Sequence, residues 1–202
     1  MIARTYDELK GACERRDYRF FTGELNLNYI WERNDLIYSN HFTDTLHIAY
    51  QEGGENKVLS IPATTTPGTK GAAFDPPTVE GVKGIAVIQP GQYPGAWSFV
   101  DSYDGFTKYP YFLQVSPINY WRDPDGDSIL TEVQAQMHKI YGTCWHRMSQ
   151  KGAGEDSEVN NWSKGCMGAI MKYWDQVIEL TRKAVSIYGP RFTGTLIEKG
   201  DF

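Results

Sequence analysis

The chain has 202 residues, of which 41% are hydrophobic, 14% aromatic and 22% charged. This composition excludes a disordered protein, and the length predicts a single domain over residues 1–202 with a sizeable core. The formal net charge of -5 excludes a protein that binds nucleic acid through its phosphates alone, because such binding needs concentrated Lys and Arg.

The three cysteines, Cys13, Cys144 and Cys166, are too few and too odd in number for a disulfide framework, and none forms a CxxC pair. We therefore expect a reducing compartment. The first residues lack an apolar signal region, and no run of about 18 apolar residues occurs. This predicts a soluble protein made in the cytoplasm without a signal peptide or membrane insertion. Action outside the cytoplasm would need another component to release or carry it.

The N-terminal part alternates between one helical and several strand-like segments. Apolar residues at helical spacing predict a helix over 6–16, capped by Thr5 or Asp7, with Cys13 in the core. Alternating apolar and polar residues predict strands over 25–32, 45–50 and 57–61. The turn residues of 52–56 make the last two strands a hairpin.

A long stretch rich in Pro, Gly and Thr covers residues 62–84, and we interpret it as a flap or long loop beside a site. An apolar run over 84–93 that ends in a Pro-Gly turn predicts a central strand and its exit. Shorter strands are expected over 97–101, 111–115 and 118–122. With helices mainly near the ends, the pattern predicts a β-rich α+β domain.

Residues 123–128 place three carboxylates around a glycine, like the start of a calcium loop. The glycine is fourth rather than sixth, and the twelfth residue is Gln134, so a tight solvated turn is favoured over a metal site. The candidate ligands are Asp123, Asp125 and Asp127, and no cofactor is expected. A short helical segment is expected over 131–140. We interpret His41, His47 and His138 as structural histidines.

The remaining histidine and a cysteine carry the chemistry. Apolar and aromatic residues before His146 place it at a strand end, and 149–157 form a surface loop. From Met167 the spacing predicts an amphipathic helix, so Cys166 is expected at its N-terminus, where unpaired amides and nearby Lys164 favour a thiolate. Gly165 permits a sharp turn.

Amides near Gly165 and Cys166 are expected to hold an oxyanion, and Ser163 to orient the imidazole or line the oxyanion site. The spacing of Cys166 and His146 alone favours a buried structural cysteine over a catalytic one. Cys144 lies two residues before His146 and so points to the same face of a strand, where a packing role is favoured.

The whole pattern, His146, sixteen intervening residues and then Ser163-x-Gly165-Cys166, is similar to the catalytic signature of L,D-transpeptidases. The layout also resembles small cysteine proteins encoded by tailed phages of Bacteroidota, including the closing segment 188–197. The resemblance implies a β-rich sheet or barrel core, a cysteine nucleophile that attacks a peptidoglycan stem-peptide carbonyl, and a histidine base.

The chain departs from the family pattern at several positions. Members usually have His-Gly-Thr at 146–148, a histidine at 164, and an arginine or asparagine two residues after the cysteine, where this chain has Gly168. Arg147 or Lys164 is the expected substitute for the missing arginine that recognises the donor carboxylate. The resemblance and the aromatic content together make the candidate substrate-binding residues Arg147, Lys164, Trp162 and Tyr93.

Without a signal peptide, phage-associated cell-wall degradation of the endolysin kind is favoured over wall building. The partner expected is peptidoglycan or its peptides, without nucleic acid. Two alternatives remain. One is an inactive wall-binding or virion structural module that uses exposed Tyr93, Trp97 and Trp121. The other is a cysteine protease or acyltransferase that acts on protein.

Overall fold

The computed structural model describes residues 2–34, 40–68, 78–79, 82–83, 85–101, 109–123, 136–137, 142–148, 158–160, 162–163 and 165–202. Its centre is a closed eight-stranded barrel in the order β1-β13-β7-β8-β11-β12-β3-β2. This confirms the β-rich α+β class. The barrel strands are β1 (Asn28–Arg33), β2 (Asp44–Glu52), β3 (Glu55–Thr64), β7 (Gly91–Val100), β8 (Tyr111–Gln114), β11 (Trp145–Arg147), β12 (Met167–Ala169) and β13 (Arg191–Glu198).

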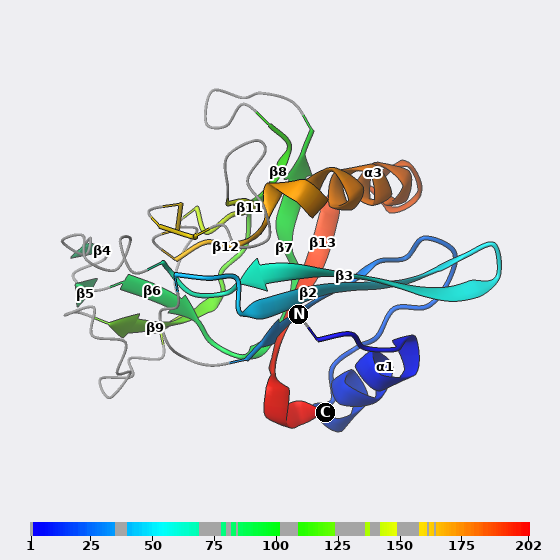
Figure 1. Ribbon diagram of the computed structural model, residues 1–202, viewed down its shortest axis with the longest axis horizontal. Coiled ribbons are helices and arrows are strands. Elements are labelled where there is room, and N and C mark those ends of the chain that lie inside the picture. The colour runs from blue at the N-terminus through cyan, green and yellow to red at the C-terminus, as the bar shows by residue number, and fades with distance from the viewer. Residues whose placement is uncertain are drawn as a thin grey trace.

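Two parallel pairings complete the barrel. β1 pairs with β13, which brings the two ends of the chain together, and β11 pairs with β12. Parallel neighbours need a long connection, so residues far apart in sequence become adjacent here. The β2–β3 hairpin turns at Gly53 and Gly54, both with positive φ, and its tip extends away from the rest of the barrel (Figure 1).

The barrel interior is filled with aromatic rings. Trp145 of β11 stacks on Trp97 of β7, with ring centroids 4.3 Å apart, and both are buried. Gly194 of β13 leaves room for them, because a Cβ there would lie 2.4 Å from Cζ2 of Trp145. The core is therefore tightly packed directly behind β11.

Two helices cover the barrel. α1 (Tyr6–Arg15) begins with a capping box between Thr5 and Glu8 and ends close to the predicted boundary. It packs against the outward-facing Ile30 and Ala49. Cys13 lies on the buried face of α1, as expected. α3 (Met171–Tyr188) packs into the main core through Trp174, Val177, Ile178, Leu180 and Ala184. The two helices lie on opposite sides of the β2–β3 hairpin (Figure 1).

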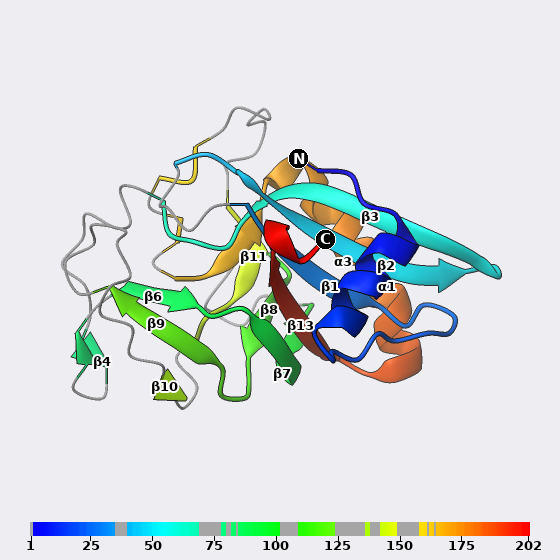
Figure 2. The same cartoon turned by 90° about the horizontal axis from the view of Figure 1, so that it is seen from below.

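Smaller sheets extend the domain at the end opposite the tip of the β2–β3 hairpin (Figures 1 and 2). β6 (Ile85–Ile88), β9 (Asn119–Asp123) and β10 (Gln136–Met137) form one sheet, and β4 (Thr78–Val79) pairs with β5 (Val82–Lys83). The chain ends in a short 3-10 turn, η1 (Lys199–Asp201). No helix in the described ranges is long and apolar enough to cross a membrane.

Three predicted boundaries need correction. The strand predicted at the start of 84–93 is β6, which ends before Pro90 as expected, but β7 begins at Gly91 rather than at residue 97 and lies in a different sheet. Residues 62–64 belong to β3 rather than to a loop, and 136–137 form a strand where a helix was predicted. The rest of the expected flap over 62–84 lies partly outside the described residues, and its role stays a prediction.

Candidate functional site

Residues of β11 and β12 alternate between the barrel interior and its outer surface. Trp145 and Met167 are register partners, and both side chains belong to the main core. Because strand side chains alternate, the flanking Cys144, His146 and Cys166 face outward. The parallel pairing thus brings the predicted base and the predicted nucleophile to one face, although twenty residues separate them in sequence.

Cys166 does not stand at a helix N-terminus, contrary to the sequence prediction. It directly precedes β12, and α3 begins only at Met171. The apolar spacing from Met167 onward fits both elements, because Met167 and Ala169 alternate as a strand does before the helical period begins. The source of a thiolate here is therefore the neighbouring side chains rather than the helix dipole.

The thiol of Cys166 is favoured in its ionised form. A hydrogen bond with the Cys144 side chain is the strongest influence that lowers its pKa, burial opposes it, and the hydrogen bond and charge of His146 lower the pKa further. The backbone N–H of Cys144 also donates to Sγ of Cys166 over 3.4 Å. The net result is a pKa well below the usual range, which favours the thiolate.

The imidazole of His146 is held in one orientation. Its Nδ1 lies 2.7 Å from the carbonyl oxygen of Arg147, which can only accept, so Nδ1 carries the hydrogen and Nε2 is left for the sulfur. Burial lowers the pKa of His146, but the hydrogen bond and charge of Cys166 outweigh it and raise the pKa overall. The two shifts together describe a thiolate–imidazolium pair.

A tight turn presents the sulfur. The Ser163 hydroxyl donates to the carbonyl of Cys166 over 2.7 Å and accepts from the N–H of Gly165 over 3.0 Å. Gly165 has a φ of 140°, and a Cβ there would lie 2.8 Å from the carbonyl oxygen of Ala86 in β6. Only glycine fits this conformation and this close approach.

This turn bears on two predicted roles. Ser163 braces the backbone through these two hydrogen bonds, and its role toward the imidazole or the oxyanion stays a prediction. The N–H of Gly165 is already paired with Ser163, whereas the predicted role of the Cys166 amide stays a prediction. The backbone N–H of Cys144 is directed at the sulfur.

The predicted substrate-binding residues divide into three groups. Arg147 lies beside the site, with its guanidinium 4.1 Å from the ring centroid of Tyr109, and its buried Nε has no hydrogen-bond partner within the described part of the chain. Trp162 packs against the small apolar cluster that includes Met148, so it is near the site but half-buried. Lys164 lies outside the described residues.

Tyr93 is in the wrong place for the predicted role. It is 8% exposed and belongs to the main core, and its hydroxyl donates to the carbonyl of Gln89. Trp97 is buried as well. The alternation of β7 turns both rings inward, so neither can stack on a sugar or on a partner surface.

Of the other histidines and candidate ligands, His47 and Asp123 are described and buried. His47 is buried between Glu32 and Ser60, at 3.0 and 2.8 Å, which makes it the hydrogen-bonded structural histidine expected. Asp123 is buried at the end of β9, whereas Asp125, Asp127 and His138 lie outside the described residues. Among described residues, no group of three or more His, Cys, Asp or Glu could hold a metal ion.

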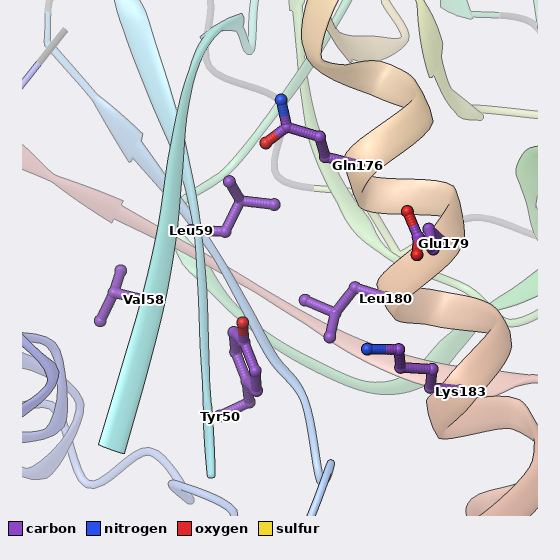
Figure 3. A pocket seen from close by; sticks show the side chains of 7 residues that line it. All are labelled: Tyr50, Val58, Leu59, Gln176, Glu179, Leu180 and Lys183. Carbon is purple, nitrogen blue, oxygen red and sulfur yellow. The ribbon is translucent and has the colours of Figure 1, made fainter. Parts of the chain in front are cut away.

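A groove of about 270 Å³ lies between the β2–β3 hairpin and α3, with side chains from both elements approaching one another (Figure 3). Its Lys183 is paired with Glu52 over 3.0 Å. No cysteine, serine or histidine is among its lining residues, so the Cys166 site remains the stronger candidate for chemistry. The lining residues are Tyr50, Val58, Leu59, Gln176, Glu179, Leu180 and Lys183.

Sequence reasoning missed the contribution of Cys144 and Tyr109. Strand alternation placed Cys144 on the correct face, but its direct contact with Cys166 depends on the β11–β12 pairing, for which there is no local signal. Comparisons with protein-family models, curated proteins and solved structures found no match.

Proposed function

We propose that the protein is a cysteine-dependent acyl-transfer enzyme that acts on peptidoglycan stem peptides, in the manner of L,D-transpeptidases. The observation that carries the proposal is the partly exposed Cys166, whose sulfur lies beside the oriented imidazole of His146 and has a lowered pKa. A structural cysteine has no need of these partners, as the isolated and buried Cys13 illustrates.

The substrate class rests on the resemblance of the signature from His146 to Cys166, and the environment of Arg147 is compatible with it. A stem peptide carries carboxylates, and Arg147, which follows His146 in β11, has a buried Nε without a hydrogen-bond partner among the described residues. Phage-associated degradation of the cell wall, with or without attachment to the virion, is the setting in which such an enzyme would act.

The arrangement supports a two-step reaction. The Cys166 thiolate attacks the amide carbonyl, and the imidazolium of His146 protonates the departing amine, which leaves a thioester on the sulfur. Neutral His146 then removes a proton from water or from an incoming amine, which attacks the thioester. Water gives hydrolysis and an amine gives a cross-link. The N–H of Cys144 can stabilise negative charge that develops next to the sulfur.

The test compares Cys166→Ala with Cys13→Ala on purified peptidoglycan and on muropeptides, with products followed by mass spectrometry. Cys166→Ala is expected to lower the turnover rate at least ~10³-fold, because the nucleophile is lost. Cys13→Ala serves as the control for loss of a thiol elsewhere, and it should keep turnover. Wild-type rates in Cys166→Ala would contradict the mechanism.

The same assay separates the alternatives. Binding of muropeptides without turnover by the wild-type protein would favour an inactive wall-binding module. Turnover of protein amides but not of muropeptides would favour a protein-directed protease or acyltransferase.

A further inference from the structure

The two outward-facing cysteines of the site lie directly across the β11–β12 pair from each other. Trp145 pairs with Met167 and His146 with Gly168, so the preceding pair is Cys144 and Cys166. The N–H of Met167 donates to the carbonyl of Cys144 over 3.2 Å, which extends the ladder to this pair. Neighbouring strands are about 4.8 Å apart, within the Cα separations of roughly 4.4–6.8 Å that a disulfide accepts.

The sulfur atoms also lie near the same backbone groups. Sγ of Cys166 accepts the backbone N–H of Cys144 over 3.4 Å, so it lies close to the backbone of its partner. Both sulfur atoms lie near the carbonyl oxygen of Gly142, at 3.2 Å for Cys144, whose S–H donates to it, and at 4.0 Å for Cys166. No large movement of the backbone is needed to join them.

The two thiols differ in the way that a sensing pair requires. Cys166 is partly exposed, and the backbone N–H of Cys144 that donates to its sulfur favours the thiolate, so it is the thiol that an oxidant reaches first. Cys144 is 1% exposed and is positioned to react only with its neighbour. Cys13, on the buried face of α1, belongs to the apolar cluster between α1 and the barrel and has no part in this pair.

We propose that Cys144 is a resolving cysteine, and that a hydroperoxide converts the Cys144–Cys166 pair into a reversible disulfide. The Cys166 thiolate attacks the peroxide oxygen, which gives a sulfenic acid and releases hydroxide, or an alkoxide from an organic peroxide. The released base takes the proton of the Cys144 thiol, and the resulting thiolate displaces hydroxide from the sulfenic acid, which leaves as water with the proton of the His146 imidazolium. Two thiols and one hydrogen peroxide become one disulfide and two waters.

The disulfide switches off the proposed acyl-transfer activity, because it occupies the nucleophilic sulfur, and this consequence rests on the proposed function. It also protects Cys166 from irreversible oxidation to the sulfinic acid, since the sulfenic acid is consumed by its neighbour. A thiol reductant restores both cysteines and the activity.

The test exposes the folded full-length protein to hydrogen peroxide and measures its intact mass and its free thiols. We expect the mass to fall by that of two hydrogens and the number of free thiols to fall from three to one. Digestion without reduction is expected to yield a peptide linking Cys144 to Cys166, and dithiothreitol to release it. Cys13→Ala should form the same link.

Cys144→Ser separates a resolving cysteine from a bystander. In this variant we expect peroxide to add oxygen to Cys166 and to form the sulfinic acid, and dithiothreitol should not reverse the change. Retention of three free thiols by the peroxide-treated wild type, a link that includes Cys13, or sulfinic acid on wild-type Cys166 without a link would overturn the proposal. Because the bond is detected by mass, it remains testable if the protein fails to turn over muropeptides.

Discussion

Cys13 and Cys166 carry the same thiol group, but their surroundings shift its pKa in opposite directions. On the inner face of α1, burial raises the pKa of Cys13 to about 12, and the nearby charge of Glu14 raises it further. Beside β11, burial acts in the same direction on Cys166, but the Cys144 side chain and His146 reverse it. Partners rather than burial decide whether a cysteine of this protein is reactive.

The comparison also separates a packing role from a chemical one. Cys13 lies in an apolar cluster with Leu9, Ala12 and Ile30, where a small hydrophobic side chain suffices. Cys166 lies on the outer surface of the barrel, at a turn that Ser163 and Gly165 hold in place. One labelling measurement and three substitutions test this contrast.

Selective alkylation should show the largest difference between the two regions. At neutral pH we expect iodoacetamide to label Cys166 at least ~10³-fold faster than Cys13, because a thiol with a pKa near 12 is almost entirely protonated there. Peptide mapping over time measures both rates in one sample. In urea-unfolded protein the cysteines should react at similar rates. If Cys166 and Cys13 are labelled equally slowly in the native protein, Cys166 is not a thiolate.

His146→Gln should remove most of the advantage of Cys166. Loss of the imidazole removes a charge that favours the thiolate and the acid that protonates the leaving amine, so turnover should fall by about 10²–10⁴-fold. Muropeptide release gives the effect on turnover. Circular dichroism checks that the fold is retained. A variant that keeps the wild-type rate would show that His146 is not the base.

Gly168→Ala should destabilise the strand pair on which the site depends. A Cβ at this position would lie 2.3 Å from the carbonyl oxygen of His146 and 2.6 Å from Cγ of Met148. We expect a loss of about 1–3 kcal/mol in the free energy of unfolding, measured in urea. Gly200→Ala is the matched control, because a Cβ there meets nothing within 4 Å, and a change under about 0.5 kcal/mol is expected. Similar values for the two variants would refute this packing argument.

Ser163→Ala should have the smallest effect of the four. It removes two hydrogen bonds within the turn, so the free energy of unfolding should fall by about 1–2 kcal/mol and Cys166 should be labelled more slowly. Ser163→Thr keeps the hydroxyl and should restore most of the loss. Ser186→Ala removes an exposed hydroxyl on α3 and serves as the control. If Ser163→Ala changes neither the free energy of unfolding nor the labelling rate of Cys166, the two hydrogen bonds of Ser163 are not needed to hold the turn.

Local signals predicted much of the fold. Thr5, one of the two candidate caps, marked the start of α1, and two glycines marked the turn of the β2–β3 hairpin. Closure of the barrel could not be predicted, because the parallel pairing of β1 with β13 joins residues more than 160 positions apart. The start of β7 at Gly91 was missed because its first residues, rich in Gly and Pro, have the composition of a turn.

The site was predictable in its two main residues but not in its surroundings. The signature from His146 to Cys166 identified the pair, yet it misplaced the start of α3, because Met167 and Ala169 fit both a strand and a helix. The roles of Cys144 and of the Gly165 amide follow from backbone hydrogen bonds across the β11–β12 region, which a linear sequence does not display.

The pH dependence of Cys166 alkylation, in the wild type and in His146→Gln, tests the thiolate–imidazolium pair most directly. The lowered pKa of Cys166 keeps the sulfur ionised as the pH falls, until the pH passes below that pKa. The wild-type rate should therefore reach its plateau well below pH 9, and the inflection should move upward in His146→Gln. An inflection for the wild type at or above the ordinary thiol value of 9.0, unchanged by the substitution, would contradict the account.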